Sequence, residues 1–260
     1  MSRKTLRRAA FCVCAAVFAV CVFLLGRTYF GMRRTEQSVD KLREVLENAQ
    51  NQVRPPQSGE PQPQQPAVRP GLSELREQNG DLQAWICIPG TSVDYPVMQT
   101  GANDPEHYLR RGFDGTYDFN GLPFADARCS FSPRSDLLIV YGHSIRTGIM
   151  FSDLLSYKEY DFWQQHKTVT LDTLQGSESY EICAAFLYDA TSGQDAFKPH
   201  AAVDFDSEQA FEEYVGQALA LSYYDTGARP QWGDRLLLLV TCDRRLLDEG
   251  RMVLLCFAPS

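Results

Sequence analysis

Two apolar runs near the C-terminal end constrain the fold more than any other feature of the chain. Residues 236–242 hold five consecutive apolar residues, then a threonine and Cys242, and residues 252–257 form the second run. Runs of this length are typical of strands that are buried on both faces. The polar connection between them, which ends at Gly250, is short enough for an antiparallel return. Such a pair of strands would place Cys242 close to Arg251.

Cys242 and His143 are the candidate nucleophile and the candidate acid and base. A cysteine reacts as its thiolate, and a nearby cation such as Arg251 favours that form. His143 lies in a Gly-His-Ser sequence after an apolar run, and a histidine so placed can serve in proton transfer. The alternative for Cys242 is the role of a small buried hydrophobic residue, which is how most free cysteines pack.

The other cysteines and histidines indicate neither a metal nor a cofactor. Their spacing contains no Cys-x-x-Cys pair and no cysteine–histidine cluster of the zinc type. Three cysteines inside apolar runs are expected to pack in the core: Cys87, Cys183 and Cys256. Three histidines in polar sequence are expected at the surface: His107, His166 and His200. Cys129 lies in a polar stretch, and its role stays open.

The N-terminal segment predicts a membrane anchor. Residues 9–26 form an uncharged apolar run of 18 residues that follows the basic residues 1–8. This length is near the lower limit for a membrane-spanning helix. A cleaved signal peptide is the alternative, but the run is long for one, and residues 24–27 do not form a small-x-small cleavage site. We expect residues 1–8 in the cytoplasm and the catalytic domain outside a single-pass cell-membrane anchor.

The rest of the chain divides into a linker and one folded domain. Residues 27–71 combine a polar helix at 35–53 with a proline- and glutamine-rich stretch that cannot bury a core. Residues 72–260 are long enough for one catalytic domain of ordinary size. The net charge of −8 argues against a nucleic-acid partner, because phosphate binding requires concentrated positive charge.

The folded domain is predicted to be mainly β. Five further strand candidates precede the two C-terminal runs, at residues 84–88, 93–99, 137–143, 168–172 and 180–187. Helices are expected at residues 72–79, 151–157 and 207–221, the last with a serine at its start. Many short strands with few helices favour a closed β-barrel with peripheral helices, preceded by the N-terminal transmembrane helix and the linker.

The ordered motifs of this domain resemble those of the sortases, the cysteine transpeptidases of Gram-positive cell surfaces, and of class B in particular. The Thr-Leu-x-Thr-Cys motif of that family corresponds to residues 238–242, with leucine in place of the first threonine. The family's histidine corresponds to His143 and its arginine to Arg251. Shorter matches extend over residues 79–126, and the last predicted helix lies where class B members carry a helical insertion. The resemblance covers nearly all of residues 72–257.

The resemblance implies a two-step acyl transfer. Cys242 would cleave a C-terminal sorting signal at a threonine to give a thioester, and an amine would then accept the acyl group. His143 would act as acid and base, and Arg251 would stabilise the oxyanion or position the peptide. Supporting or substrate-binding roles are expected for four neighbours: Thr241, Asp243, Tyr141 and Ser144. Some class A sortases use calcium, but this sequence has no acidic cluster that requires it.

The implied partners are surface proteins that carry a sorting signal, an amine of a peptidoglycan precursor or of a pilin, and the membrane. Two alternatives stay open. One is a tethered cysteine hydrolase that uses water as the acceptor, which the absence of an amine-dependent product would indicate. The other is a non-catalytic surface-binding module in which Cys242 packs in the core, and rapid labelling of that thiol would argue against it.

Overall fold

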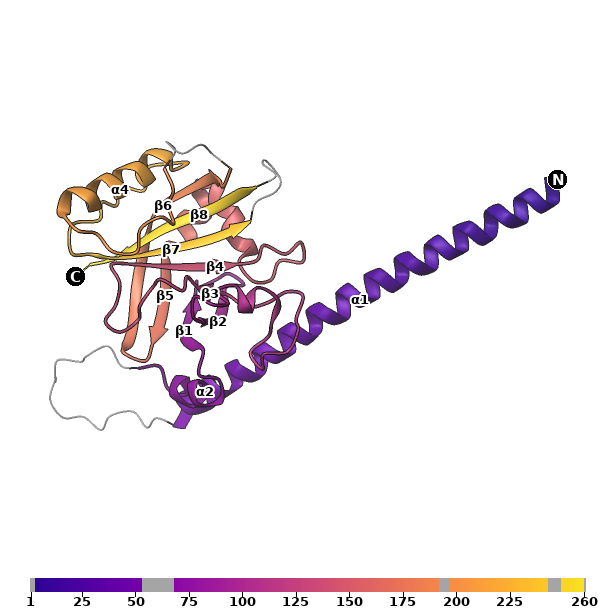
Figure 1. Cartoon of the computed structure of the whole chain (residues 1–260), viewed down its shortest axis with the longest axis horizontal. Helices are drawn as coiled ribbons and strands as arrows, with labels where there is room; N and C mark the ends of the chain where they lie inside the picture. Colours follow the sequence, from indigo (N-terminus) through magenta and orange to yellow (C-terminus); the bar gives the residue numbers. More distant parts are fainter. Residues whose placement is uncertain (1–2, 53–67, 192–196, 243–248, 260) are drawn as a thin grey trace.

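Eight β-strands of the described residues close into a barrel in the order β1-β2-β3-β4-β7-β8-β6-β5 (Figure 1). The computed structural model describes residues 3–52, 68–191, 197–242 and 249–259. The strands are β1 (Leu82–Cys87), β2 (Asp94–Met98), β3 (Phe124–Ala125), β4 (Leu137–Gly142), β5 (Thr168–Thr173), β6 (Gly176–Asp189), β7 (Arg235–Cys242) and β8 (Gly250–Ala258). The predicted closed barrel with peripheral helices is therefore confirmed.

Strand β7 lies between β4 and β8, and only its pairing with β8 was predicted from the sequence. It pairs antiparallel with β8, as the sequence predicts, and the register sets Cys242 directly opposite Arg251. It pairs in parallel with β4, where Gly142 lies beside Thr241. His143 is the next residue after β4, so the chain leaves that strand beside the end of β7. The pairing of three strands thus brings distant sequence positions to one end of the barrel.

Helices surround the barrel at the predicted places and at two places that were not predicted. The described elements are α1 (Arg3–Gln52), α2 (Leu72–Gln78), α3 (Tyr160–Gln165) and α4 (Glu208–Leu221), with 3-10 helices η1 (His107–Arg110) and η2 (Ser152–Lys158). The helix predicted at residues 151–157 is thus a 3-10 helix, and the two short helices α3 and η1 were not predicted. Helix α4 packs over β6 and begins as predicted, because Ser207 Oγ accepts a hydrogen bond from the Ala210 backbone N–H at 3.2 Å.

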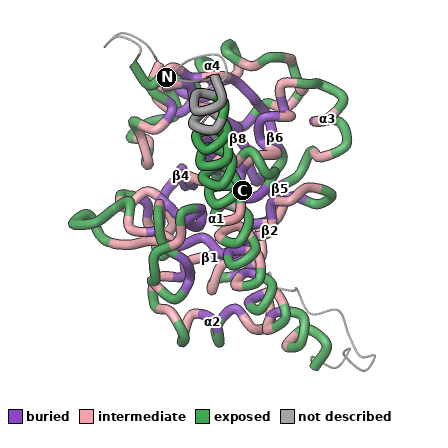
Figure 2. Tube along the Cα trace, turned by 90° about the vertical axis from the view of Figure 1, so that its right-hand side faces the viewer, coloured by how far each residue is buried: buried purple, intermediate pink, exposed green. Residues whose placement is uncertain are grey.

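The N-terminal half of α1 projects away from the barrel (Figure 1). Within Phe11–Gln52 the helix has a segment long and apolar enough to cross a membrane, and that segment is not buried against the rest of the protein. Figure 2 shows α1 exposed along most of its length while the strands are buried. Length and composition of this kind fit both a membrane anchor and a signal sequence.

The polar helix predicted at residues 35–53 is the C-terminal part of α1, and it packs on the barrel instead of standing free as a linker. Three apolar side chains on one face of this helix are buried against α2 and one side of the barrel: Val39, Leu42 and Leu46. Polar contacts fix the same part of the helix. Arg43 Nε donates to Asp94 Oδ2 at 2.9 Å, and Thr35 Oγ1 donates to Asp118 Oδ2 at 2.6 Å.

Candidate active site

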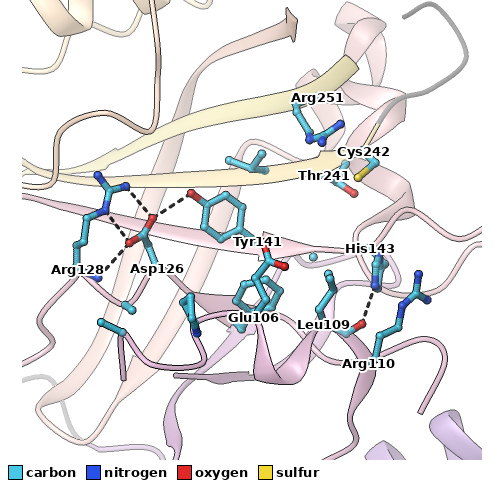
Figure 3. Close-up of a pocket in the computed structure, with 16 residues that line it drawn as sticks. Glu106, Leu109, Arg110, Asp126, Arg128, Tyr141, His143, Thr241, Cys242 and Arg251 are labelled. Atoms are coloured by element: carbon cyan, nitrogen blue, oxygen red, sulfur yellow. Dashed lines mark hydrogen bonds and ion pairs between the residues drawn. The ribbon is translucent and has the colours of Figure 1, made fainter. Parts of the chain in front are cut away.

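A pocket of about 600 Å³ opens at the end of the barrel where β4 and β7 finish (Figure 3). Its lining includes Cys242, His143 and Arg251, which the sequence analysis selected from three separate parts of the chain. Thr241 and Tyr141 also line it. The volume lies in the range of pockets that hold small molecules or short peptide segments.

Cys242 and Arg251 face each other because they are direct partners in the antiparallel ladder. Cys242 is the last residue of β7 and is half-buried, so its thiol stands at the pocket wall and not within the core. Side chains at directly opposite positions project to the same face of a sheet, with Cβ atoms about 5 Å apart. The strand pairing therefore places the two side chains next to each other at the pocket, as Figure 3 shows.

Two residues just before Arg251 in the sequence hold its guanidinium in place. Nη2 donates to Glu249 Oε2 at 3.1 Å, and Nη1 donates to the Gly250 carbonyl at 3.1 Å. A guanidinium has five N–H donors, and these contacts with described residues use two of them. The side chain keeps 24% of its surface exposed, so the group can still reach a ligand in the pocket.

The turn after β4 fixes His143. Its Nε2 lies 2.8 Å from the Leu109 carbonyl, and since a carbonyl only accepts, Nε2 carries a hydrogen in this contact. The His143 carbonyl accepts a hydrogen bond from the Phe151 N–H at 2.9 Å. The preceding residue has to be glycine, because a Cβ on Gly142 would lie 2.5 Å from ring atoms of Phe151. These contacts hold His143 in the pocket wall, with Nε2 directed at the Leu109 carbonyl.

A polar network forms another side of the pocket, and of its members only Tyr141 was predicted as a site residue. Tyr141 Oη donates to Asp126 Oδ2 at 3.0 Å, and Arg128 donates through Nε and Nη2 to the same carboxylate at 2.9 and 2.8 Å. Burial alone would raise the pKa of Asp126, but the hydrogen bonds from Arg128 outweigh it and the pKa is lowered. Burial and the Asp126 charge raise the pKa of Tyr141. The tyrosine thus remains a neutral donor beside an ionised carboxylate.

The remaining predicted positions lie at different places. Thr241 is buried, and its Oγ1 has no hydrogen-bond partner among the described residues. Ser144 forms a bridge with Met150 in the turn beyond His143 and is not among the residues that line the pocket. Asp243 lies outside the described residues. Three further lining residues that were not predicted as site residues belong to the segment around η1 and follow no apolar pattern: Glu106, Leu109 and Arg110.

The other thiols and imidazoles lie away from the pocket. Cys183 and Cys256 are fully buried as predicted, while Cys87 is half-buried. The open question about Cys129 is answered, since its sulfur is buried near the Leu137 carbonyl and the Ile139 N–H, and burial raises its pKa to about 11. The three histidines predicted at the surface are partly buried, and none of them lines the pocket: His107, His166 and His200.

Comparison with known proteins identifies similar chains. No protein-family model matches the sequence. The chain is 30% identical to sortase B of Listeria monocytogenes over 188 residues, which cover 72% of this chain and 73% of that protein. It is 27% identical to sortase B of Staphylococcus aureus over 176 residues, covering 68% and 69% of the two chains. The solved Staphylococcus aureus sortase B–substrate complex has a TM-score of 0.75 at 22% identity, covering 89% of this chain and 99% of that one.

Proposed function

The chain belongs to the sortase B family, and from that premise we propose that Cys242 is its nucleophile, His143 its acid and base, and Arg251 its oxyanion donor. Membership makes the protein a cysteine transpeptidase. The observation that carries the assignment of roles is the pocket in which a strand-end thiol has a guanidinium directly opposite and an imidazole on the residue that follows the neighbouring strand. The same residue types at unrelated positions would not form an acyl-transfer site.

In the first step the Cys242 thiolate attacks the carbonyl carbon of a threonine in a C-terminal sorting signal. The carbonyl π electrons move to oxygen, and Arg251 N–H groups stabilise the resulting negative charge. When the tetrahedral intermediate collapses, the peptide C–N bond breaks and protonated His143 gives its proton to the leaving amine. A thioester joins Cys242 to the substrate protein, and the C-terminal fragment departs.

In the second step an amine attacks the thioester carbonyl. Neutral His143 accepts a proton from that amine, a new amide bond forms, and Cys242 leaves as the thiolate. One solved sortase B is a complex with triglycine, which supports a short glycine peptide as a model for the acceptor amine. We propose that the acceptor of this chain is the amine of a peptidoglycan precursor or of a pilin.

The apolar part of α1 supports a membrane-anchored enzyme. We propose that residues 9–26 remain in the cell membrane as a single span, with residues 1–8 in the cytoplasm and residues 72–260 as the extracytoplasmic catalytic domain. The apolar stretch of this helix is exposed instead of being packed on the barrel, which suits contact with lipid. Surface proteins that carry a sorting signal would then meet the enzyme as they emerge from the membrane.

The reaction is tested with the full chain in detergent, a library of threonine-containing sorting peptides, and triglycine as the amine. We expect mass spectrometry to detect a thioacyl adduct on Cys242 and, when triglycine is present, a peptide joined to it. Cleavage that proceeds at the same rate with and without any amine would identify a hydrolase instead. A failure of every peptide to react with Cys242 would contradict catalysis and favour a binding module.

Arg251 is expected to accelerate acylation more than it contributes to binding. The Arg251→Lys variant should acylate about 10²–10³-fold more slowly, because a lysine cannot present the forked N–H donors to a developing oxyanion. Single-turnover measurement of adduct formation gives this rate, and KM should change much less than kcat. Arg235→Lys is the matched control, since Arg235 begins the same hairpin at its far end and pairs there with Glu178. Equal rates for the two variants would contradict the oxyanion role.

A further inference from the structure

The segment between β2 and β3 presents two aromatic side chains to solvent beside α1. Tyr117 is 64% exposed and Phe119 is 59% exposed. Among the large apolar side chains that the structure describes outside α1, these two are the most exposed. Neighbouring exposed aromatics of this kind typically mark a surface that contacts a partner or a membrane.

Buried hydrogen bonds fix where this segment lies along α1. Asp118, between the two aromatics, accepts a hydrogen bond through Oδ2 from Thr35 Oγ1 at 2.6 Å. Asn120 Nδ2 donates to the same Thr35 oxygen at 2.8 Å. Thr35 is 1% exposed and Asn120 is 5% exposed, so water does not compete for these contacts. The aromatic pair is therefore attached to one defined position on the helix.

That position corresponds to the depth of lipid headgroups. Helix α1 exposes Tyr29 and Phe30 just after its apolar run, and aromatic residues are typical of the membrane–water interface. Thr35 lies five residues further, which is about 7.5 Å along a helix. The headgroup layer on each side of a bilayer is about 5–8 Å thick. Tyr117 and Phe119, on either side of the residue bonded to Thr35, are thus placed at the outer part of that layer.

The charges around the aromatic pair suit a phospholipid surface. The Arg110 guanidinium lies over the Phe119 ring, 4.5 Å from its centroid. Further basic side chains come just before Thr35 on α1 and just after η1: Arg33, Arg34 and Arg111. Asp114 and Asp118 in the same segment offset part of this charge, since the hydrogen bond from the neutral Thr35 hydroxyl leaves the Asp118 carboxylate negative. Arginine side chains near a membrane surface bind anionic headgroups and extend along apolar surface.

We propose that Tyr117 and Phe119 dock on the headgroup layer of the membrane that α1 enters. The inference rests on the proposed anchoring by α1 and adds a second contact, so that the domain is held at one tilt instead of pivoting about a single helix. Figure 1 shows that β4 and β7 end on the side of the barrel toward which the N-terminal half of α1 leaves. Docking therefore holds the pocket of Cys242 facing the bilayer surface.

The test uses the full chain in nanodiscs of phosphatidylcholine and phosphatidylglycerol that contain a phospholipid with a diazirine in its headgroup. After irradiation and trypsin digestion, mass spectrometry locates the lipid adducts. We expect an adduct on the peptide of residues 112–128, which holds both aromatics. In the variant with Tyr117→Ser and Phe119→Ser, its yield should fall about tenfold, while the adduct on residues 28–33, which hold the interfacial Tyr29 and Phe30, stays unchanged.

The control is Trp232→Ser, because Trp232 is an exposed aromatic that precedes β7 at the opposite end of the barrel from Cys242. That variant should keep the adduct on residues 112–128. A wild-type chain labelled on residues 28–33, which lie at headgroup depth, but not on 112–128 would overturn the docking. Resistance to alkaline extraction reports anchoring by α1 separately, and the triglycine assay in detergent reports transpeptidation separately.

Discussion

Replacing Cys242 with alanine is expected to abolish both cleavage and amine transfer while the barrel stays folded. The thioester cannot form without the sulfur, and none of the other described groups that line the pocket is a nucleophile of comparable strength. Cys242 is half-buried at the end of β7, so the substitution removes an atom from the pocket wall and leaves the core filled. Mass spectrometry should detect neither the thioacyl adduct nor the triglycine product, and circular dichroism should give a wild-type spectrum.

Cys129→Ala is the matched control for that experiment. The Cys129 thiol is buried, and burial raises its pKa to about 11, so it contributes almost no thiolate at neutral pH. We expect this variant to melt at a lower temperature, because it loses buried contacts, and to acylate at the wild-type rate per folded molecule. An adduct that persists in Cys242→Ala, or that disappears in folded Cys129→Ala, would place the nucleophile elsewhere.

The sequence predicted the strands that carry the site because apolar runs with defined ends determine them. Residues 236–242 and 252–257 are apolar on both faces, and the short polar connection between them favours one pairing. No sequence pattern predicted the parallel pairing of β7 with β4. The paired residues, such as Leu137 and Leu236, lie far apart in the sequence. Strand β3, with two residues, is too short for any periodic pattern.

Helix α1 illustrates why contacts are harder to predict than elements. The apolar stripe at Val39, Leu42 and Leu46 is visible in the sequence, but the surface that it packs against comes from α2 and the barrel. The basic residues between the apolar run and this stripe do not interrupt the helix, because arginine is a good helix former. The apolar run and the polar helix after it are therefore one continuous element attached to the domain.

The pocket was predictable only where a residue stands at the end of a recognisable strand. Cys242, His143 and Arg251 occupy such positions. Asp126 and Arg128 form their network with Tyr141 through a loop after β3, and Leu109 contacts His143 from η1. These groups act through tertiary contacts that no local pattern encodes.

Replacing His143 with alanine is expected to lower both acylation and amine transfer by about 10²–10⁴-fold, the usual contribution of a positioned acid–base group. The loss should appear in kcat, because the variant leaves Cys242 and Arg251 in place to bind the peptide. The contact of Nε2 with the Leu109 carbonyl holds the imidazole in one orientation. The hydrogen bond from the Phe151 N–H to the His143 carbonyl fixes the backbone that carries the ring. The substitution leaves a space where the ring was, so added imidazole should enter it and restore part of the rate.

His166→Ala is the control for the imidazole itself. His166 Nδ1 contacts the Pro89 carbonyl at 2.9 Å, and its ring packs on Phe162 away from the pocket. We expect this variant to lose some stability to heat, to keep the wild-type rate per folded molecule, and to show no response to added imidazole. Comparable loss of kcat in both variants would mean that His143 serves the fold alone. Loss confined to His143→Ala, with rescue by imidazole, requires proton transfer at that position, because a structural role does not respond to a free base.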